Sequence, residues 1–405
     1  MRRALLLLAA ACLLLVAISL LDGFFVRLPD GTASPVPPTE RIGIIHVHTT
    51  AAHGAAALRE ARHRSANLQI VMAAAQEAGL SYVTITDHNV LSQLTPGDHV
   101  PPGLTLLLGE EVSARGGHFL ALNLPDGWKP PASLNARQSL ASARASGATI
   151  FLAHPFGNGA PWRDWNTTDF DGIEIWNDDA VWRSNSLFDL FISAVMYRVN
   201  PEYSLVRLVR TPQQNIAKWD ELLRDRPVVG ICASDAHGGI WLGGDTTLRF
   251  PRYTPVFRLA RQHLLLPAKY AADPGSADAG VLLEALKNGH SYCALDALSP
   301  GAGFIQSVSS ATAVAGPGDS LVWTPGSRLH ISLPHTSTLP RIEVFRDGRR
   351  FAEAHGWSLD APLDGPGRYR TEVFLRPPGF TTWHRWPMWI LSNPTYVLPP
   401  PRTLP

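Results

Sequence analysis

Five apolar, β-prone runs along the chain each end in residues that commonly bind metal ions. The runs cover residues 42–48, 82–88, 104–111, 149–154 and 228–237. Short segments rich in Val, Ile and Leu are typical of buried strands. One such segment would be uninformative, but five in an ordered series predict strands that bring imidazoles and carboxylates to a shared site.

Helical patterns separate these strands at residues 67–78, 134–146, 211–224 and 279–287, and Gly79 and Gly147 provide C-cap signals. Further strands are expected at 118–123, 172–176 and 291–295. The alternation favours an α/β fold with a parallel sheet or barrel, with the ligands at the C-terminal ends of its strands. Two longer insertions, 181–209 and 240–266, either cover the mouth of the site or pack outside it as ordinary helices.

From about residue 302 the pattern changes to short strands separated by turn residues, including a hairpin that turns at Asp347-Gly348. This predicts a small β-sandwich, whose ordinary role is that of an accessory domain. We therefore divide the chain into an apolar anchor (1–26), a linker (27–40), a metal-site domain (41–300) and a β-sandwich domain (301–405).

The N-terminus carries a second clear signal. Arg2 and Arg3 precede an apolar run over 4–21, long enough to cross a bilayer, which Asp22 interrupts. We interpret it as an uncleaved signal anchor, with a cleaved signal peptide as the alternative. The preceding positive charge predicts a membrane-anchored protein whose catalytic domain is periplasmic or extracytoplasmic, or secreted if the segment is removed.

Composition adds limits. The 405 residues carry a formal charge of +1, so no bulk electrostatic argument favours nucleic-acid binding. Of the three cysteines, Cys12 lies in the anchor. Cys232 and Cys293 lie in apolar strand patterns, where we expect buried free thiols rather than a disulfide.

The candidate ligands are imidazoles and carboxylates. His46 and His48 are two residues apart on a strand and so leave one face. The other candidates, at or near later strand ends, are His88, Glu111, His118, His154, Asp235 and His237, with His53 in a loop. Such a set suits Zn, Mn or Fe, and the lack of thiolates argues against a purely structural zinc site.

The ordered series resembles the polymerase and histidinol phosphatase (PHP) superfamily of metal-dependent phosphoesterases over roughly residues 41–300. The resemblance implies a distorted seven-stranded (β/α) TIM-like barrel with two or three metal ions at its C-terminal mouth. It assigns the first ion to His46, His48, Glu111 and Asp235. It assigns the second to Glu111, His118 and His154, and the third to His53, His88 and His237.

Some assignments are weaker than others. Many relatives carry an acidic residue at the position of His53. Glu111 is preferred to Glu110 because it fits the Gly-x-Glu pattern of the family, and strand alternation points Glu110 away. Asp87 either orients an imidazole or acts as an acid or base. Glu174 and Asn177 receive a structural role.

The resulting hypothesis is hydrolysis of a small-molecule phosphate ester by a metal-activated water, with Asp87, His154 or His237 protonating the leaving alkoxide. Candidates for binding the phosphate are Arg115, Arg163, Arg183 and Arg198. One alternative is an amide, carbamate or ester hydrolase of the same fold, which an arginine at the mouth would argue against. Another is an inactive, membrane-tethered binding protein. The sequence predicts no oligomeric state.

Overall fold

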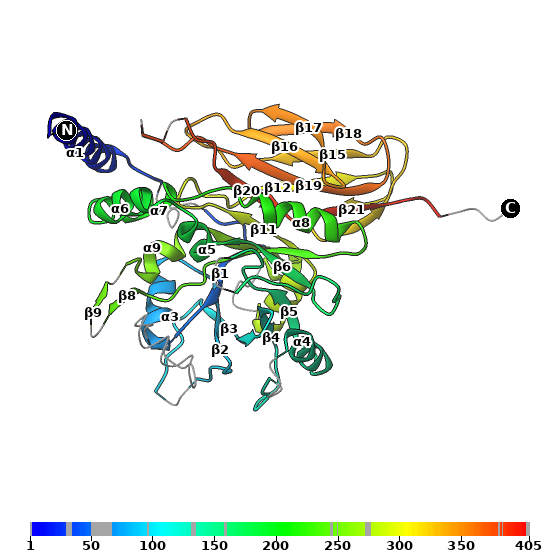
Figure 1. Cartoon of the computed structure of the whole chain (residues 1–405). Helices are drawn as coiled ribbons and strands as arrows, with labels where there is room; N and C mark the ends of the chain where they lie inside the picture. The colour runs from blue at the N-terminus through cyan, green and yellow to red at the C-terminus, as the bar shows by residue number, and fades with distance from the viewer. Residues whose placement is uncertain are drawn as a thin grey trace.

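The computed structural model describes residues 2–29, 35–49, 67–94, 97–130, 135–157, 160–243, 246–248, 250–271, 277–379, 381–382 and 384–401. A long N-terminal helix, α1 (Arg2–Phe25), stands at one side of an α/β region, and the C-terminal strands lie against that region (Figure 1). Within α1, Leu5–Phe25 is long and apolar enough to cross a membrane. A signal sequence would share these properties.

The α/β region begins with β1 (Glu40–Val47), α3 (Leu68–Glu77), β2 (Tyr82–His88), β3 (Thr105–Ala114), β4 (Gly117–Leu122), α4 (Ala136–Ala145), β5 (Thr149–Leu152) and β6 (Gly172–Asn177). It continues with α5 (Asp178–Arg183), α6 (Leu187–Met196), α7 (Pro201–Val206), α8 (Gln213–Leu223), β7 (Val229–Ala233), β8 (Ile240–Gly243) and β9 (Thr246–Leu248). It ends with α9 (Tyr253–Phe257), β10 (Arg261–Leu265), η1 (Ala268–Tyr270), α10 (Ala279–Lys287) and β11 (Ser291–Ala294). The predicted helices are therefore confirmed as α3, α4, α8 and α10. Asn67 and Asp278 cap two of them through their side chains.

Most strands of this region form one mixed sheet in the order β11-β10-β1-β2-β3-β4-β5-β6-β7, and β8 and β9 form a separate two-stranded sheet. The pairs β1–β2, β2–β3, β5–β6 and β6–β7 are parallel, whereas β4 runs antiparallel to both of its neighbours. The α/β assignment holds, and the C-terminal ends of the parallel strands meet at one edge, as expected for ligand-bearing strands.

The predicted closed barrel is not confirmed. β10 pairs with residues 40–43 of β1, so that part of the β1 edge is already occupied. The segment after β7 bonds only to the remainder of the edge, through Ser234 N to Ile45 O (2.9 Å), His48 N to Ala236 O (3.0 Å) and an isolated Val47–Ala236 bridge. The ends of the sheet meet at these contacts, but β1 and β7 form no ladder within the described residues.

The C-terminal strands are β12 (Ile305–Ser309), β13 (Val314–Ala315), β14 (Ser320–Val322), β15 (Arg328–Ser332), β16 (Arg341–Arg346), β17 (Arg349–His355), β18 (Ser358–Pro362), β19 (Gly367–Phe374), β20 (Met388–Ser392) and β21 (Thr395–Leu398). The predicted hairpin is confirmed as β16–β17, with Asp347 and Gly348 both at positive φ (51° and 77°). β12, β13, β15 and β18 form one sheet, and the others join the large sheet where β20 pairs with β11. Buried residues of both sheets belong to one core, as in a sandwich.

The two cysteines of the α/β region form a disulfide, so the expectation of free thiols is wrong. Cys232 on β7 and Cys293 on β11 have Cα atoms 5.6 Å apart, within the usual range for a disulfide. β7 and β11 are not paired in the sheet but contact each other across the interior. The 61 residues between the cysteines concealed this proximity in the sequence.

Candidate metal centre

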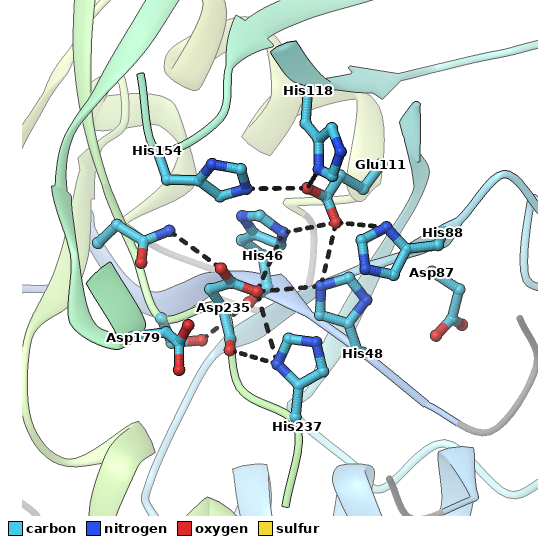
Figure 2. A network of polar contacts seen from close by, with 12 residues as sticks. His46, His48, Asp87, His88, Glu111, His118, His154, Asp179, Asp235 and His237 are labelled. Atoms are coloured by element: carbon cyan, nitrogen blue, oxygen red, sulfur yellow. Dashed lines mark hydrogen bonds and ion pairs between the residues drawn. The ribbon is translucent and has the colours of Figure 1, made fainter. Parts of the chain in front are cut away.

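The strand ends bring the candidate ligands into one buried cluster, which Figure 2 shows from close by. Each side chain is supplied by a different part of the sheet edge: His46 by β1, His48 just after it, His88 by β2, Glu111 by β3, His118 by β4, His154 just after β5, and Asp235 and His237 after β7. His53, the remaining predicted ligand, lies outside the described residues. The grouping arises because the parallel strands share a direction and end at the same edge.

In four of these side chains, nitrogen and oxygen atoms lie as close together as the ligands of one metal ion. Oε2 of Glu111 lies 3.3 Å from Nε2 of His46 and 3.4 Å from Nε2 of His48. Oδ1 of Asp235 lies 3.5 Å and 3.2 Å from the same two nitrogens. An ion with tetrahedral bonds of about 2.1 Å requires ligand atoms about 3.4 Å apart. Each of the two nitrogens therefore lies at a distance from both oxygens that ligands of one divalent ion would have.

Glu111 also faces a second group through its other oxygen. Its Oε1 lies 2.7 Å from Nδ1 of His118 and 3.0 Å from Nε2 of His154. A carboxylate whose two oxygens point at two sets of imidazoles has the arrangement needed to bridge two ions. Glu111 is also the residue that the sequence resemblance assigned to both of the first two ions, an assignment that stays a prediction.

A third group differs in part from the assignment made by resemblance. His48, His88 and His237 each have one ring nitrogen that lies within 4.8 Å of a ring nitrogen of the other two. The ring centroids of His48 and His237 are 4.2 Å apart, and those of His48 and His88 are 4.6 Å apart. His88 Nδ1 is also 2.8 Å from Glu111 Oε2. The third group in the structure therefore contains His48, His88 and His237, and Glu111 contacts His88. The resemblance had assigned only His88 and His237 to this group, together with His53.

Glu174 of β6 orients this cluster, a role that its sequence context did not indicate. Its Oε1 accepts a 2.6 Å hydrogen bond from Nδ1 of His46, and its Oε2 accepts bonds from the backbone N–H of His154 (2.6 Å) and Nδ2 of Asn177 (2.8 Å). With Nδ1 protonated, His46 presents the lone pair of Nε2 to an ion. That Nε2 atom is buried and has no hydrogen-bond partner among the described residues. The only signal in the sequence was an acidic residue near the end of a strand.

Asp87 occupies a supporting position beside the cluster. Its carboxylate accepts hydrogen bonds from the backbone N–H of Thr49 (2.5 Å), the hydroxyl of Thr49 (2.7 Å) and the hydroxyl of Ser92. Thr49 follows His48 directly. Asp87 therefore fixes the chain where it leaves β1.

Three of the candidate ligands have backbone conformations that residues other than glycine rarely adopt. His46, His154 and Asp235 have φ values of 65°, 28° and 52°. Each such residue costs on the order of 1–3 kcal/mol and persists only where surrounding contacts impose it. At His46 the β1–β2 register also shifts, between Ile44 and Val47. The strain turns these side chains toward the cluster, as is common at functional sites.

The electrostatics of the cluster suit a cation. Burial alone would raise the pKa of Glu111, but His88, His118 and His46 lower it well below its usual value. Burial would lower the pKa of His154, but Glu111 raises it to about 9. The carboxylate thus remains ionised, while the histidine retains a proton that a metal ion would displace.

A cavity of ≈ 490 Å³ opens onto this cluster. Its lining residues are His88, Glu111, His118, His154, Gly157, Ala160, Asp179, Ala180, Arg183 and Asp235. Among the described residues that line it, Arg183 is the one arginine of the four proposed from the sequence. Its Nε donates a 2.5 Å hydrogen bond to Oδ2 of Asp179, which directs the guanidinium. The two insertions border a small adjoining pocket. Its lining residues include Trp182 from the first insertion, Tyr253 from the second, and His237.

No family model matches the sequence, and no curated protein is similar to it by sequence. Among solved structures, a proposed metal-dependent phosphoesterase from Bifidobacterium adolescentis is similar with 18% identity and a TM-score of 0.28. The match covers 51% of this chain and 92% of that chain. A likeness of this size supports no assignment of function by itself. The side chains of the cluster carry that argument instead.

Proposed function

We propose that the chain is a metal-dependent hydrolase of the PHP type that cleaves phosphate esters. The observation that carries the proposal is Glu111, whose two oxygens face two groups of histidines below a cavity that Arg183 also lines. The order of the ligands along the chain, which resembles the PHP superfamily, supports the same conclusion. Zn, Mn or Fe suits these donors, with two or three ions as the expected number.

When bound, divalent ions at such a centre neutralise phosphoryl oxygens and activate a water molecule for attack near neutral pH. Glu111 and Asp235 supply the negative charge that holds the ions, and Glu174 fixes His46 in the ligating tautomer. Arg183 supplies a guanidinium for the phosphoryl oxygens that face away from the ions. The buried walls exclude bulk water from the cluster, which strengthens each of these interactions.

The leaving alkoxide requires a proton, for which the sequence offered Asp87, His154 and His237. His154 lines the cavity and His237 lines the adjoining pocket. Asp87 is engaged by Thr49 and Ser92 and is not among the lining residues of either space. We therefore propose one of the two histidines as the acid. Because a histidine that binds an ion cannot also donate that proton, the acid is whichever of the two does not bind an ion. Loss of metal in His154→Ala would therefore leave His237 as the acid.

Arg183 favours a phosphate ester over an amide, carbamate or carboxylic ester. A planar guanidinium matches the oxygens of a phosphate, whereas the scissile carbonyl of an amide or ester is neutral in the ground state. The clustering of His46, His48, His88, His118 and His237 with Glu111 also supports an active site over an inactive binding protein. Small phosphate esters are thus the proposed substrates, with no role for nucleic acid.

The deciding experiment combines metal analysis with a substrate panel. The full chain in detergent, loaded with Zn²⁺ or Mn²⁺, should bind two or three ions and release phosphate from phosphomonoesters or phosphodiesters. His154→Ala should lower both the metal content and the rate. Cleavage of carboxylic esters or amides with no phosphate release would instead establish the alternative hydrolase. A single ion or none, after loading, would point to a degenerate site.

We propose a membrane-anchored, extracytoplasmic location. α1 supplies an apolar helix of sufficient length, and Arg2 and Arg3 before it favour a cytoplasmic N-terminus. The Cys232–Cys293 disulfide supports the same orientation, because disulfides persist mainly in oxidising compartments. Protease added to cells with a permeabilised outer envelope should digest the domain, and the intact membrane-bound chain should retain the mass of the full sequence. Protection of the domain would overturn the orientation.

A further inference from the structure

Helix α6 presents an apolar face to the surroundings. Leu187 is 85% exposed, Phe191 56% and Phe188 48%. At 100° per residue these three positions fall within an arc of about 100° on the helix. The neighbouring face, which carries Ile192 and Met196, is buried. Such a cluster of large exposed apolar side chains on one helix marks a contact surface.

The apolar N-terminal helix packs directly against α6. Val16 of α1 contacts a cluster that includes Ile192 and Met196, and a Cβ placed on Gly23 would lie 2.9 Å from Cε of Met196. Figure 1 shows α1 and α6 at the same side of the molecule. Val16 precedes Gly23 by about 10 Å along the helix axis. Contact with α6 therefore extends well into the apolar segment.

Polar contacts fix the end of α1 to the folded domain. Asp22 is 1% exposed, and its Oδ2 accepts hydrogen bonds from the hydroxyl of Tyr203 (2.8 Å) and the backbone N–H of Thr381 (3.2 Å). Nδ2 of Asn200 donates to the carbonyl of Gly23 (3.1 Å). The one acidic residue near the end of the span is thus satisfied by the domain, and the direction of α1 relative to α6 is set.

We propose that α6 lies in the interface of the bilayer that α1 spans, which brings the metal cavity next to lipid headgroups and makes their phosphate esters the substrate class. An amphipathic helix at this depth buries its apolar face at the boundary between headgroups and acyl chains. The cavity and this surface are linked along the chain, since Arg183, which lines the cavity, lies four residues before Leu187. The choice of substrate rests on the proposed phosphoesterase activity, whereas the position of α6 does not.

The position of α6 is measured with an environment-sensitive fluorophore on the full chain in vesicles of phosphatidylcholine and phosphatidylglycerol. Cys12 is replaced by alanine, and a single cysteine is introduced as Leu187→Cys or, as a control, Val314→Cys on β13, which is 73% exposed. We expect nitroxide-labelled lipid to quench the fluorophore at position 187 and not at 314. Iodide in the aqueous phase should quench the fluorophore at 314 and not at 187. Equal quenching by iodide and none by the lipid at both positions would overturn the proposal.

The substrate class is tested with Phe188→Glu/Phe191→Glu on two phosphate esters. Hydrolysis of phosphatidic acid in vesicles should fall by about tenfold or more, since interfacial binding scales with buried apolar area, while hydrolysis of soluble p-nitrophenyl phosphate should not change. If the wild-type chain cleaves the soluble ester but not the lipid, the substrate inference fails and the proposed function stands. If it cleaves neither, the proposed function fails, and the fluorophore still decides the position of α6.

Discussion

Oε1 of Glu174 lies 2.6 Å from Nδ1 of His46, and this contact sets the chemistry of one of the two fully buried histidines in the cluster. Neither side chain is exposed to solvent. Because Nδ1 donates to the carboxylate, Nε2 is left as a lone-pair donor directed at Glu111 and Asp235. Glu174 thus acts on a metal ion through a histidine rather than by direct contact.

Glu174→Gln should weaken metal binding without unfolding the chain. The amide keeps the shape of the side chain but cannot accept bonds from both His46 and His154 as the carboxylate does. Loss of such a partner typically costs 10–100-fold in metal affinity or activity. Isothermal titration with Zn²⁺ and kcat/KM on a phosphate ester provide the measurements, with Glu343→Gln on β16 as control. Unaltered affinity and rate in Glu174→Gln would show that the contact is only structural.

Adjacent glutamates on β3 offer a matched pair. Glu111→Gln removes the carboxylate shared by the histidine groups and should reduce metal content and lower kcat by roughly 100-fold or more. Glu110 points to the other face of the strand, where burial raises its pKa to about 7. Glu110→Gln should retain the metal and the activity. Elemental analysis and rate measurements on both variants check this, and equal losses would mean that the wrong glutamate has been assigned.

The choice between Glu110 and Glu111 also shows what the sequence could determine. Strand periodicity and a run of ligands at successive strand ends are local signals, so the strands, the four helices and the direction of Glu111 were accessible. The Asp347-Gly348 hairpin was accessible for the same reason, since its turn requires two residues at positive φ.

The remaining features depend on contacts between distant segments. The Cys232–Cys293 disulfide joins strands that are not neighbours in the sheet, so no spacing rule indicates it. β10 is inserted beside β1, and a periodicity argument cannot foresee that it would occupy part of the edge needed for barrel closure. Glu174 was given a structural role because one acidic residue in a strand carries no pattern. In each case the missing information was which surfaces meet.

Arg183 should contribute to phosphate recognition and little else. Arg183→Ala removes charge-assisted hydrogen bonds worth about 1.5–3 kcal/mol, so kcat/KM for a phosphate ester should fall by roughly 10–100-fold. Arg183→Lys keeps the charge but not the planar fork and should recover part of this loss. Metal content should be unchanged in both. Arg163→Ala serves as control, because Arg163 is exposed and does not line the cavity. If Arg163→Ala lowers kcat/KM by the same factor, Arg183 has no specific role in phosphate recognition.

A buried histidine far from the proposed ligands gives stability a distinctive pH dependence. Nδ1 of His263 on β10 lies 2.5 Å from Oε1 of Glu40, and its Nε2 lies 3.1 Å from Oδ2 of Asp296. Burial alone would lower the pKa of His263, but Asp296 and Glu40 raise it to about 9. A raised histidine pKa means that the folded state holds the proton more tightly than the unfolded state. The resulting stability is fully present below about pH 6.5 and is lost as the pH rises through about 9.

His263→Gln should therefore destabilise the chain most at and below pH 6.5, by up to roughly 3 kcal/mol, and progressively less toward pH 9 and above. The measurement is the free energy of unfolding in urea for both proteins from pH 6 to pH 10, with the metal content held equal. Groups away from this cluster are common to both proteins, so the difference between the two curves reports His263 together with its partner Asp296. A difference that is constant over this range would show that His263 stabilises the fold by packing alone and that the buried pairs with Glu40 and Asp296 do not retain its proton.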